Sequence, residues 1–327
     1  MTGVHSEVSG VIAPPPSAGP APSGPGAAAP TYAGMPSGRW VVVDGVRTWY
    51  TEHGDGAPVL LIHGGHAGAP YCLGASCWSG QFASVPGSVR LMALDRPGQG
   101  HTANPLRLDE YTLETSVDHA IGFIETMGLA PVHLVGHSRG GYIATRVALR
   151  RPDLVRSVTI VQSSTLAPGV GTTESTLARP ARPLSRESVR WYFEHYFHDS
   201  SHVTEDEIET CLRLTAADKY QELLRDFGPR HHLLTTLNPD LAARKQQTLA
   251  ALSEGRLQRP VQLVWALNDP TARADRGIEL FHLIRRHERR TTFSMVNGSS
   301  HFPFVEQAAW FNSALFNFAQ EVDNALY

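Results

Sequence analysis

Ser138 stands in the stretch GHSRG at residues 136–140, which is a G-x-S-x-G pattern. An apolar run, residues 132–135, precedes the pattern, and apolar residues at helical spacing follow it. In this strand–turn–helix context the serine sits on a sharp turn with its hydroxyl exposed. A serine hydroxyl is a poor nucleophile until a base takes its proton. The pattern therefore predicts Ser138 as a nucleophile and requires a base and an acid elsewhere in the chain.

Both partners follow later apolar runs. Asp269 comes after residues 261–265, and His301 comes after residues 292–296 and before the last helical stretch. The base needs an acid that fixes its tautomer and stabilises its protonated form. We predict His301 as the base and Asp269 as the acid, because the order serine, acid, histidine suits a serine placed in this way. Asp269 has an alternative role as a turn residue or helix cap before Thr271.

An oxygen that becomes negatively charged during the reaction needs hydrogen-bond donors already in place. The backbone N–H of Arg139, directly after the serine at the start of a helix, is one predicted donor. The second comes from the loop HGGH, which follows the apolar run 58–62. We expect the N–H of Gly65 to serve, with that of His66 as the second choice, and His63 to pack beneath the loop.

Short buried strands alternating with helices must position these residues. Continuous apolar runs fit strands buried on both faces, as in a parallel sheet, and the alternation indicates right-handed βαβ units. An Asp-Gly pair at 44–45, between runs 40–43 and 46–50, predicts a hairpin. The predicted parallel strands are residues 58–62, 89–94, 132–135, 158–161, 261–265 and 292–296, and the helices are residues 113–127, 140–150, 278–284 and 304–322.

Composition divides the chain into a tail, a core and an insertion. Residues 1–38 are rich in Pro, Ala, Gly and Ser and cannot bury enough apolar surface to offset chain entropy, so we expect a disordered tail. Residues 39–164 and 258–327 form the predicted α/β core. Residues 165–257 show no clear strand and indicate a helical cap over the edge where parallel sheets bind ligands. The predicted cap helices are residues 185–198, 205–227 and 240–253.

The 327 residues carry a net charge of −3. This balance gives no reason to expect nucleic acid or a membrane as a partner, and no apolar run reaches the length that spans a bilayer. Three cysteines do not make a disulfide framework. The first residues lack the pattern of a secretory signal, so we expect a cytoplasmic protein that acts on a small molecule.

Five stretches together resemble the α/β-hydrolase superfamily. They are LIHGG at 61–65, DRPGQG at 95–100, GHSRGG at 136–141, NDP at 268–270 and HFP at 301–303. They occur in the order and at the spacing of that superfamily. The resemblance implies an α/β-hydrolase fold, with a mostly parallel central sheet, flanking helices and a variable helical cap. It also implies a Ser-His-Asp hydrolase that works through an acyl-enzyme or a related intermediate, with no cofactor and no metal.

Within the superfamily, the stretch NDPTA at 268–272, followed by Gly277 and then Leu-Phe at 280–281, is similar to one branch. This branch contains meta-cleavage-product C–C hydrolases and monoalkyl phthalate hydrolases. The C–C hydrolases usually carry Asn before the nucleophile and Trp after the catalytic histidine, where this chain has His137 and Phe302. Both departures favour a carboxylic ester hydrolase, with an aromatic half-ester as a candidate substrate.

Two other functions stay open. A C–C hydrolase needs the same triad and a site that ketonises a dienol, and a non-enzymatic ligand receptor keeps the fold without turnover. A serine at position 138 excludes a haloalkane dehalogenase, whose nucleophile is a carboxylate. The sequence also leaves open whether the chain forms a homo-oligomer.

Three residues are candidates for substrate contact: Arg139, His66 and Phe302. The guanidinium of Arg139 either binds a substrate carboxylate, which would select half-esters, or forms a surface salt bridge while only its N–H acts. Aromatic residues of the cap either line a pocket or form a helix packing face, which their spacing favours. They are Tyr192, Phe193, Tyr196 and Phe197.

Overall fold

An eight-stranded sheet forms the centre of the computed structural model. The structure describes residues 29–69, 74–169 and 184–325, except for the side chains of residues 226–234. The strand order is β1-β2-β4-β3-β5-β6-β7-β8. β2 is antiparallel to both neighbours, and β3 to β8 are parallel, so the predicted α/β-hydrolase fold is confirmed. The strands are β1 (Arg39–Val43), β2 (Val46–His53), β3 (Ala57–Ile62), β4 (Val89–Leu94), β5 (Val132–His137), β6 (Val155–Val161), β7 (Val261–Ala266) and β8 (Thr291–Val296).

The predicted hairpin joins β1 to β2. Asp44 has a φ of 48° and Gly45 a φ of 82°, and positive φ at both central residues is what a two-residue turn between twisted strands needs. β2 then pairs with β4, from Tyr50 opposite Leu94 onward, and so joins the hairpin to the parallel strands.

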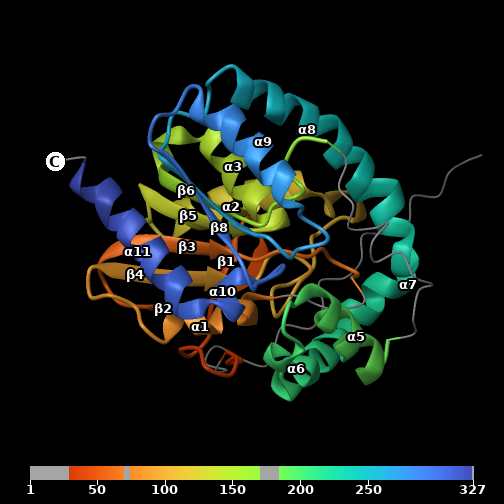
Figure 1. The fold of residues 1–327 in the computed structure, drawn as a ribbon. Coiled ribbons are helices and arrows are strands. Elements are labelled where there is room, and N and C mark those ends of the chain that lie inside the picture. Colours follow the sequence, from red (N-terminus) through yellow and green to blue (C-terminus); the bar gives the residue numbers. More distant parts are fainter. Residues whose placement is uncertain (1–28, 70–73, 170–183, 326–327) are drawn as a thin grey trace, which may run out of the picture.

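Helices cover the sheet on both faces (Figure 1). Along β3, Leu61 belongs to a hydrophobic cluster shared with α1, α10 and α11, and its neighbour Leu60 belongs to a second cluster shared with α2, α3 and α9. A strand buried on both faces is apolar throughout, which is why continuous runs marked the strands. The flanking helices are α1 (Ser79–Phe82), α2 (Leu113–Thr126), α3 (Arg139–Arg150), α9 (Ala274–Arg285), α10 (Pro303–Glu306) and α11 (Ala308–Asn324).

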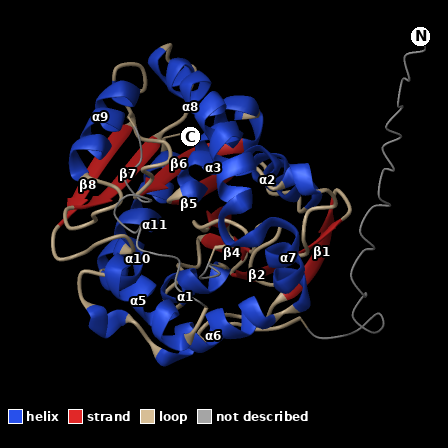
Figure 2. Cartoon of the chain, turned by 90° about the vertical axis from the view of Figure 1, so that its right-hand side faces the viewer, coloured by secondary structure: helices blue, strands red, loops and turns tan. Residues whose placement is uncertain are grey.

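The described part of the segment between β6 and β7 is helical, and we call residues 184–253 the helical insert. It contains α5 (Arg186–Tyr196), α6 (Glu205–Ala216), α7 (Asp218–His232) and α8 (Asn238–Ser253). The hydroxyls of Ser185 and Thr204 cap α5 and α6 by accepting hydrogen bonds from backbone N–H groups. α5 and α6 join the first hydrophobic cluster, whereas Leu252 of α8 joins the second. The insert therefore packs on both halves of the core, with α5 to α7 beside one end of the sheet (Figures 1 and 2).

Two helices predicted as continuous are interrupted. The predicted helix 205–227 divides at Ala217, which has an extended ψ of 143°. α7 begins directly after this residue. In its first turn, the Lys219 ammonium donates hydrogen bonds to main-chain oxygens in the loop after β4. The predicted helix 304–322 divides at Gln307, with φ −127° and ψ 44°. The break at Ala217 thus coincides with contacts to distant residues. Helical periodicity does not encode such contacts.

Residues 29–38 are ordered and pack on the core, so the prediction of a disordered tail is wrong for this segment. Tyr32 is 3% exposed, and its hydroxyl donates to the buried carboxylate of Asp95 at 2.8 Å. The main-chain oxygen of Pro30 accepts a hydrogen bond from the indole N–H of Trp49 at 2.7 Å. Composition did not reveal these contacts because the partners lie in later strands and loops. Residues 1–28 lie outside the described part of the chain.

Among the residues that the structure describes, no helix is both long and apolar enough to cross a membrane. Within the same residues, no group of three or more His, Cys, Asp or Glu side chains could hold a metal ion. Cys77 and Cys211 are buried, and Cys72 lies outside the described residues.

Deleting residues 1–36 should destabilise the protein, because it removes Tyr32 from a buried carboxylate and Pro30 from Trp49. A hydrogen bond to a charged group contributes about 1.5–3 kcal/mol. We expect Tm to fall by about 5 °C or more, measured by calorimetry against a matched control that lacks only residues 1–28. Equal Tm values for the two truncations would show that the ordered segment contributes no stability.

Candidate active site

Ser138 occupies the sharp turn between β5 and α3. Its φ of 54° and ψ of −120° are strained for a residue with a side chain, at a cost of about 1–3 kcal/mol. The N–H of Ser138 donates to the carbonyl oxygen of Val161 at 2.8 Å. The Ser138 carbonyl accepts from the N–H of Gly141 at 3.0 Å and from the hydroxyl of Ser163 at 2.6 Å. Three hydrogen bonds therefore hold the serine in its strained conformation at the end of β5.

Two glycines of this turn are required by space. A Cβ on Gly136 would lie 2.2 Å from the carbonyl oxygen of Gly140. A Cβ on Gly140 would lie 2.1 Å from the carbonyl oxygen of Ile62. α3 can therefore pack against β3 and β5 only where side chains are absent, which is the physical content of the G-x-S-x-G pattern.

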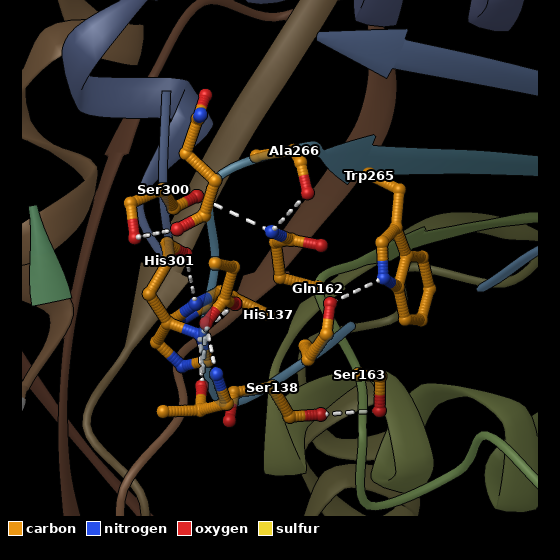
Figure 3. A network of polar contacts seen from close by, with 12 residues as sticks. His137, Ser138, Gln162, Ser163, Trp265, Ala266, Ser300 and His301 are labelled. Carbon is orange, nitrogen blue, oxygen red and sulfur yellow. Dashed lines mark hydrogen bonds and ion pairs between the residues drawn. The ribbon is translucent and has the colours of Figure 1, made fainter. Parts of the chain in front are cut away.

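His301 and Asp269 meet at the same edge of the sheet, and Figure 3 shows His301 in one cluster with His137 and Ser138. Nδ1 of His301 lies 2.6 Å from Oδ2 of Asp269, and both side chains are buried. A carboxylate only accepts, so Nδ1 carries the proton and Nε2 of the neutral ring is left to accept one. Burial alone raises the pKa of Asp269, but the His301 imidazole and hydrogen bonds from Thr271 outweigh it, so this pKa lies below its usual value.

Thr271 binds the other oxygen of the Asp269 carboxylate. Its N–H and its hydroxyl each lie 2.7 Å from Oδ1 of Asp269, and the hydroxyl is also 3.1 Å from Nδ1 of His301. Asp269 is thus a turn residue and the partner of the histidine at once, because each task uses a different oxygen.

His137 supports the main chain at His301. The Nε2–H of His137 donates to the carbonyl oxygen of His301 at 2.9 Å, and the two ring centroids lie 4.7 Å apart in an edge-to-face arrangement. Burial, and next the nearby His301, lower the pKa of His137 well below its usual value. His137 is therefore a neutral ring that anchors the histidine loop.

An arginine holds the glycine loop that follows β3. Nη2 of Arg96 donates to the carbonyl oxygens of Gly64 and Gly65 at 2.7 and 2.6 Å. His63 is fully buried: its Nδ1–H donates to the Gly64 oxygen at 2.8 Å, and its Nε2 accepts from the Arg96 N–H at 3.2 Å. Burial, and next the charge of Arg96, lower the pKa of His63 well below its usual value. A Cβ on Gly64 would lie 2.9 Å from Cβ of Ser138, so the loop passes directly beside the serine.

The helical insert reaches the histidine at the end of α5. The main-chain oxygen of Tyr196 accepts a hydrogen bond from the N–H of His301 at 2.9 Å, and the two ring centroids lie 4.8 Å apart. Phe197 stacks on Phe302 with ring centroids 5.0 Å apart. Tyr196 and Phe197 belong, with Tyr192 and Phe193, to the first hydrophobic cluster. This burial agrees with the prediction that these four aromatic residues form a helix packing face. A cavity of about 20 Å³ beside Phe302 leaves room for one water molecule.

The residues predicted for substrate contact lie in different settings, since Phe302 is buried while Arg139 and His66 are half-buried. Sequence reasoning missed two residues that hold the site together, Arg96 and Thr271. Both stand in stretches that carried the family resemblance, which was the available signal. The partners of Arg96 lie about thirty residues away, and Thr271 contacts both its neighbour Asp269 and the distant His301, so the stretches alone did not show these contacts.

Comparisons with known proteins show which family the chain resembles. The family described as "Alpha/beta hydrolase family" matches residues 59–314. Among curated proteins, the chain is 38% identical over 112 residues to (E)-2-((N-methylformamido)methylene)succinate hydrolase of Acinetobacter baylyi, covering 34% of this chain and 40% of that protein. It is 36% identical over 127 residues to 2-hydroxymuconate semialdehyde hydrolase of Pseudomonas putida, covering 38% and 43%. The matched stretches thus span less than half of these relatives.

Among solved structures, the chain resembles a meta-cleavage product hydrolase from Pseudomonas fluorescens IP01. The TM-score is 0.71 at 21% identity, over 88% of this chain and 98% of that one. At this identity the likeness shows the fold alone.

Replacing Thr271 with Val should weaken the orientation of Asp269 and His301, because it removes the hydroxyl that donates to Oδ1. A hydrogen bond to a charged group is worth about 1.5–3 kcal/mol, so we expect Ser138 to react with a fluorophosphonate probe about ten- to a hundredfold more slowly. Thr271→Ser keeps the hydroxyl and is the matched control. A Val variant that is labelled as fast as the wild type would contradict the role of this hydroxyl.

Proposed function

Since the chain belongs to the alpha/beta hydrolase family, we propose that it hydrolyses carboxylic esters through a catalytic triad of Ser138, His301 and Asp269. The observation that carries the proposal is the 2.6 Å contact between Nδ1 of His301 and Oδ2 of Asp269 at the sheet edge that holds the strained serine. A histidine oriented in this way has the free Nε2 that a serine nucleophile requires.

In the proposed reaction, Nε2 of His301 takes the proton of the Ser138 hydroxyl while Oγ attacks the ester carbonyl carbon. The tetrahedral intermediate collapses, the bond to the alcohol oxygen breaks, and His301 returns the proton to the departing alcohol. Water, deprotonated by the same nitrogen, then attacks the acyl carbon. The bond to Oγ breaks, His301 returns the proton to Ser138, and the carboxylic acid leaves. Asp269 stays ionised and holds Nδ1–H throughout, and no step uses a cofactor or a metal.

The backbone N–H groups of Gly65 and Arg139 are the proposed oxyanion donors. In a trans peptide the C=O and the following N–H point in opposite directions. Arg96 holds the carbonyl oxygen of Gly64, so the N–H of Gly65 is directed away from the arginine. The same reasoning applies to His66, the second choice, because Arg96 also holds the carbonyl oxygen of Gly65.

The helical insert acts as the proposed cap over this site. The contact of Tyr196 with His301 supports this role, since it joins α5 to the catalytic loop. At the ends of the predicted cap, 165–257, Leu166 and Leu257 belong to the core cluster shared with α2 and α3. These two ends therefore pack in the core.

Cleavage of a C–C bond is the second candidate, favoured by the similarity to 2-hydroxymuconate semialdehyde hydrolase. His137 and Phe302 favour the ester, because both differ from the residues usual in C–C hydrolases. In this chain His137 donates its Nε2–H to the His301 carbonyl, and Phe302 packs against Phe197. We further propose that Arg139, beside the nucleophile, binds the free carboxylate of an aromatic half-ester.

Ser138→Ala should abolish hydrolysis while the protein stays folded, because the change removes one oxygen at a turn and nothing from the core. Loss of the nucleophile costs several powers of ten in rate. The measurement is kcat on an activated aryl ester, with circular dichroism as the check on folding. A variant that keeps a tenth of the wild-type kcat would overturn the assignment of Ser138.

A substrate panel should separate the candidate functions. It contains an aryl acetate, an aromatic monoester, its diester and a 2-hydroxy-6-oxo-dienoate. We expect the monoester to exceed the diester by about tenfold or more in kcat/KM, and Arg139→Met to remove that preference while sparing the aryl acetate.

Each other result of the panel has a defined meaning. A dienoate cleaved faster than every ester would establish the C–C hydrolase. Equal rates on monoester and diester would remove the carboxylate contact. Binding without turnover of any substrate would identify a ligand receptor.

A further inference from the structure

One buried carboxylate touches both the helical insert and the loop that carries His301. Glu306 ends α10, and its residue is 8% exposed. We propose that Glu306 is a positioning residue that couples the insert to the catalytic histidine. This role rests on the proposed function, because it acts through the histidine that serves as the base.

The two oxygens of Glu306 divide the task between two segments. Oε1 accepts hydrogen bonds from the N–H groups of His198 and Asp199, at 2.7 and 3.1 Å. These are the residues that follow α5. Oε2 accepts from the hydroxyl of Ser299 at 3.1 Å and from the N–H of Ser300 at 2.6 Å, directly before the catalytic histidine. One side chain therefore binds four donors, two from each segment.

Only a carboxylate satisfies this arrangement with both of its ends. Each side presents at least one backbone N–H, which can only donate, and a carboxylate has acceptors alone. In Glu306→Gln one end of the side chain becomes an NH2 group that faces at least one backbone N–H, whichever way the amide turns. Either the end of α5 or the His301 loop must then lose a hydrogen bond, which on the side of Ser300 leaves a buried N–H unsatisfied.

A second connection lies next to the first. The N–H of His301 donates to the main-chain oxygen of Tyr196, the last residue of α5. Consecutive N–H groups, those of Ser300 and His301, are thus tied to Glu306 and to α5 respectively. Because α5 also reaches Glu306 through the residues after it, a displacement of the end of α5 changes both supports of the histidine main chain. The position of the insert and the orientation of the base are therefore coupled.

Glu306 is the last residue of α10, directly before a break in the helix. α10 is a four-residue turn that begins with Pro303, and the chain leaves helical geometry at Gln307. The predicted helix 304–322 is therefore interrupted immediately after the carboxylate that contacts both segments.

The test is Glu306→Gln in the full chain, with Glu288→Gln as the matched control. Glu288 is equally buried, at 8% exposed, but pairs with Arg290 away from the site. Active sites are counted with a fluorophosphonate probe, and kcat is expressed per labelled site well below Tm. We expect kcat per site to fall about tenfold or more in Glu306→Gln and to stay within twofold in Glu288→Gln.

Hydrogen exchange supplies a readout that does not depend on turnover. Glu306→Gln should speed exchange in both residues 186–199 and residues 298–302, and Glu288→Gln in neither. An unchanged kcat per labelled site would reduce Glu306 to a structural role, and faster exchange in only one of the two segments would refute the coupling.

If Glu306→Gln does not fold, Ser299→Ala removes a single donor from Oε2, and it should lower kcat per site about threefold. If the probe labels neither wild type nor control, the proposed function fails, while the exchange result still judges the coupling.

Discussion

A serine held at positive φ at the end of β5 is the constraint on which the rest of the structure depends. Such a conformation persists only where surrounding contacts determine it. Here the hydrogen bonds with Val161, Gly141 and Ser163 and the absence of side chains at Gly136 and Gly140 do so. The close approach of α3 to β3 and β5 follows from the same glycines, so one local requirement sets both the position of Ser138 and the packing of the central sheet.

Around this turn, buried polar side chains fix the main chain and one another through hydrogen bonds. Arg96 and His63 fix the carbonyl groups of the loop beside the serine. His137 stays neutral because it is buried, and it fixes the main chain at His301. Asp269 stays ionised because the histidine and Thr271 stabilise its charge. The edge of the sheet thus combines fixed dipoles with the carboxylate of Asp269, which faces the histidine, and the guanidinium of Arg96, which faces the glycine loop.

The helical insert is part of this assembly as well as a cover for it. It contributes a main-chain acceptor to His301 and two main-chain donors to Glu306. A change in the insert that shifts the end of α5 would therefore also alter the hydrogen bonds of the loop that carries His301.

The sequence by itself determined the strands, their parallel class, the turn that holds Ser138 and the chain order of Ser138, Asp269 and His301, because these depend on local patterns: apolar runs, glycines at a turn and residues directly after strands. Contacts between distant segments remained hidden. Tyr32 packs on the core and donates to Asp95, and composition near Tyr32 says nothing of Asp95. The separation of α10 from α11, the double role of Asp269 and the four donors around Glu306 were likewise decided by tertiary structure. The physical reason is that a buried polar group takes whichever partners the fold brings to it, and several of those partners lie tens to hundreds of residues away.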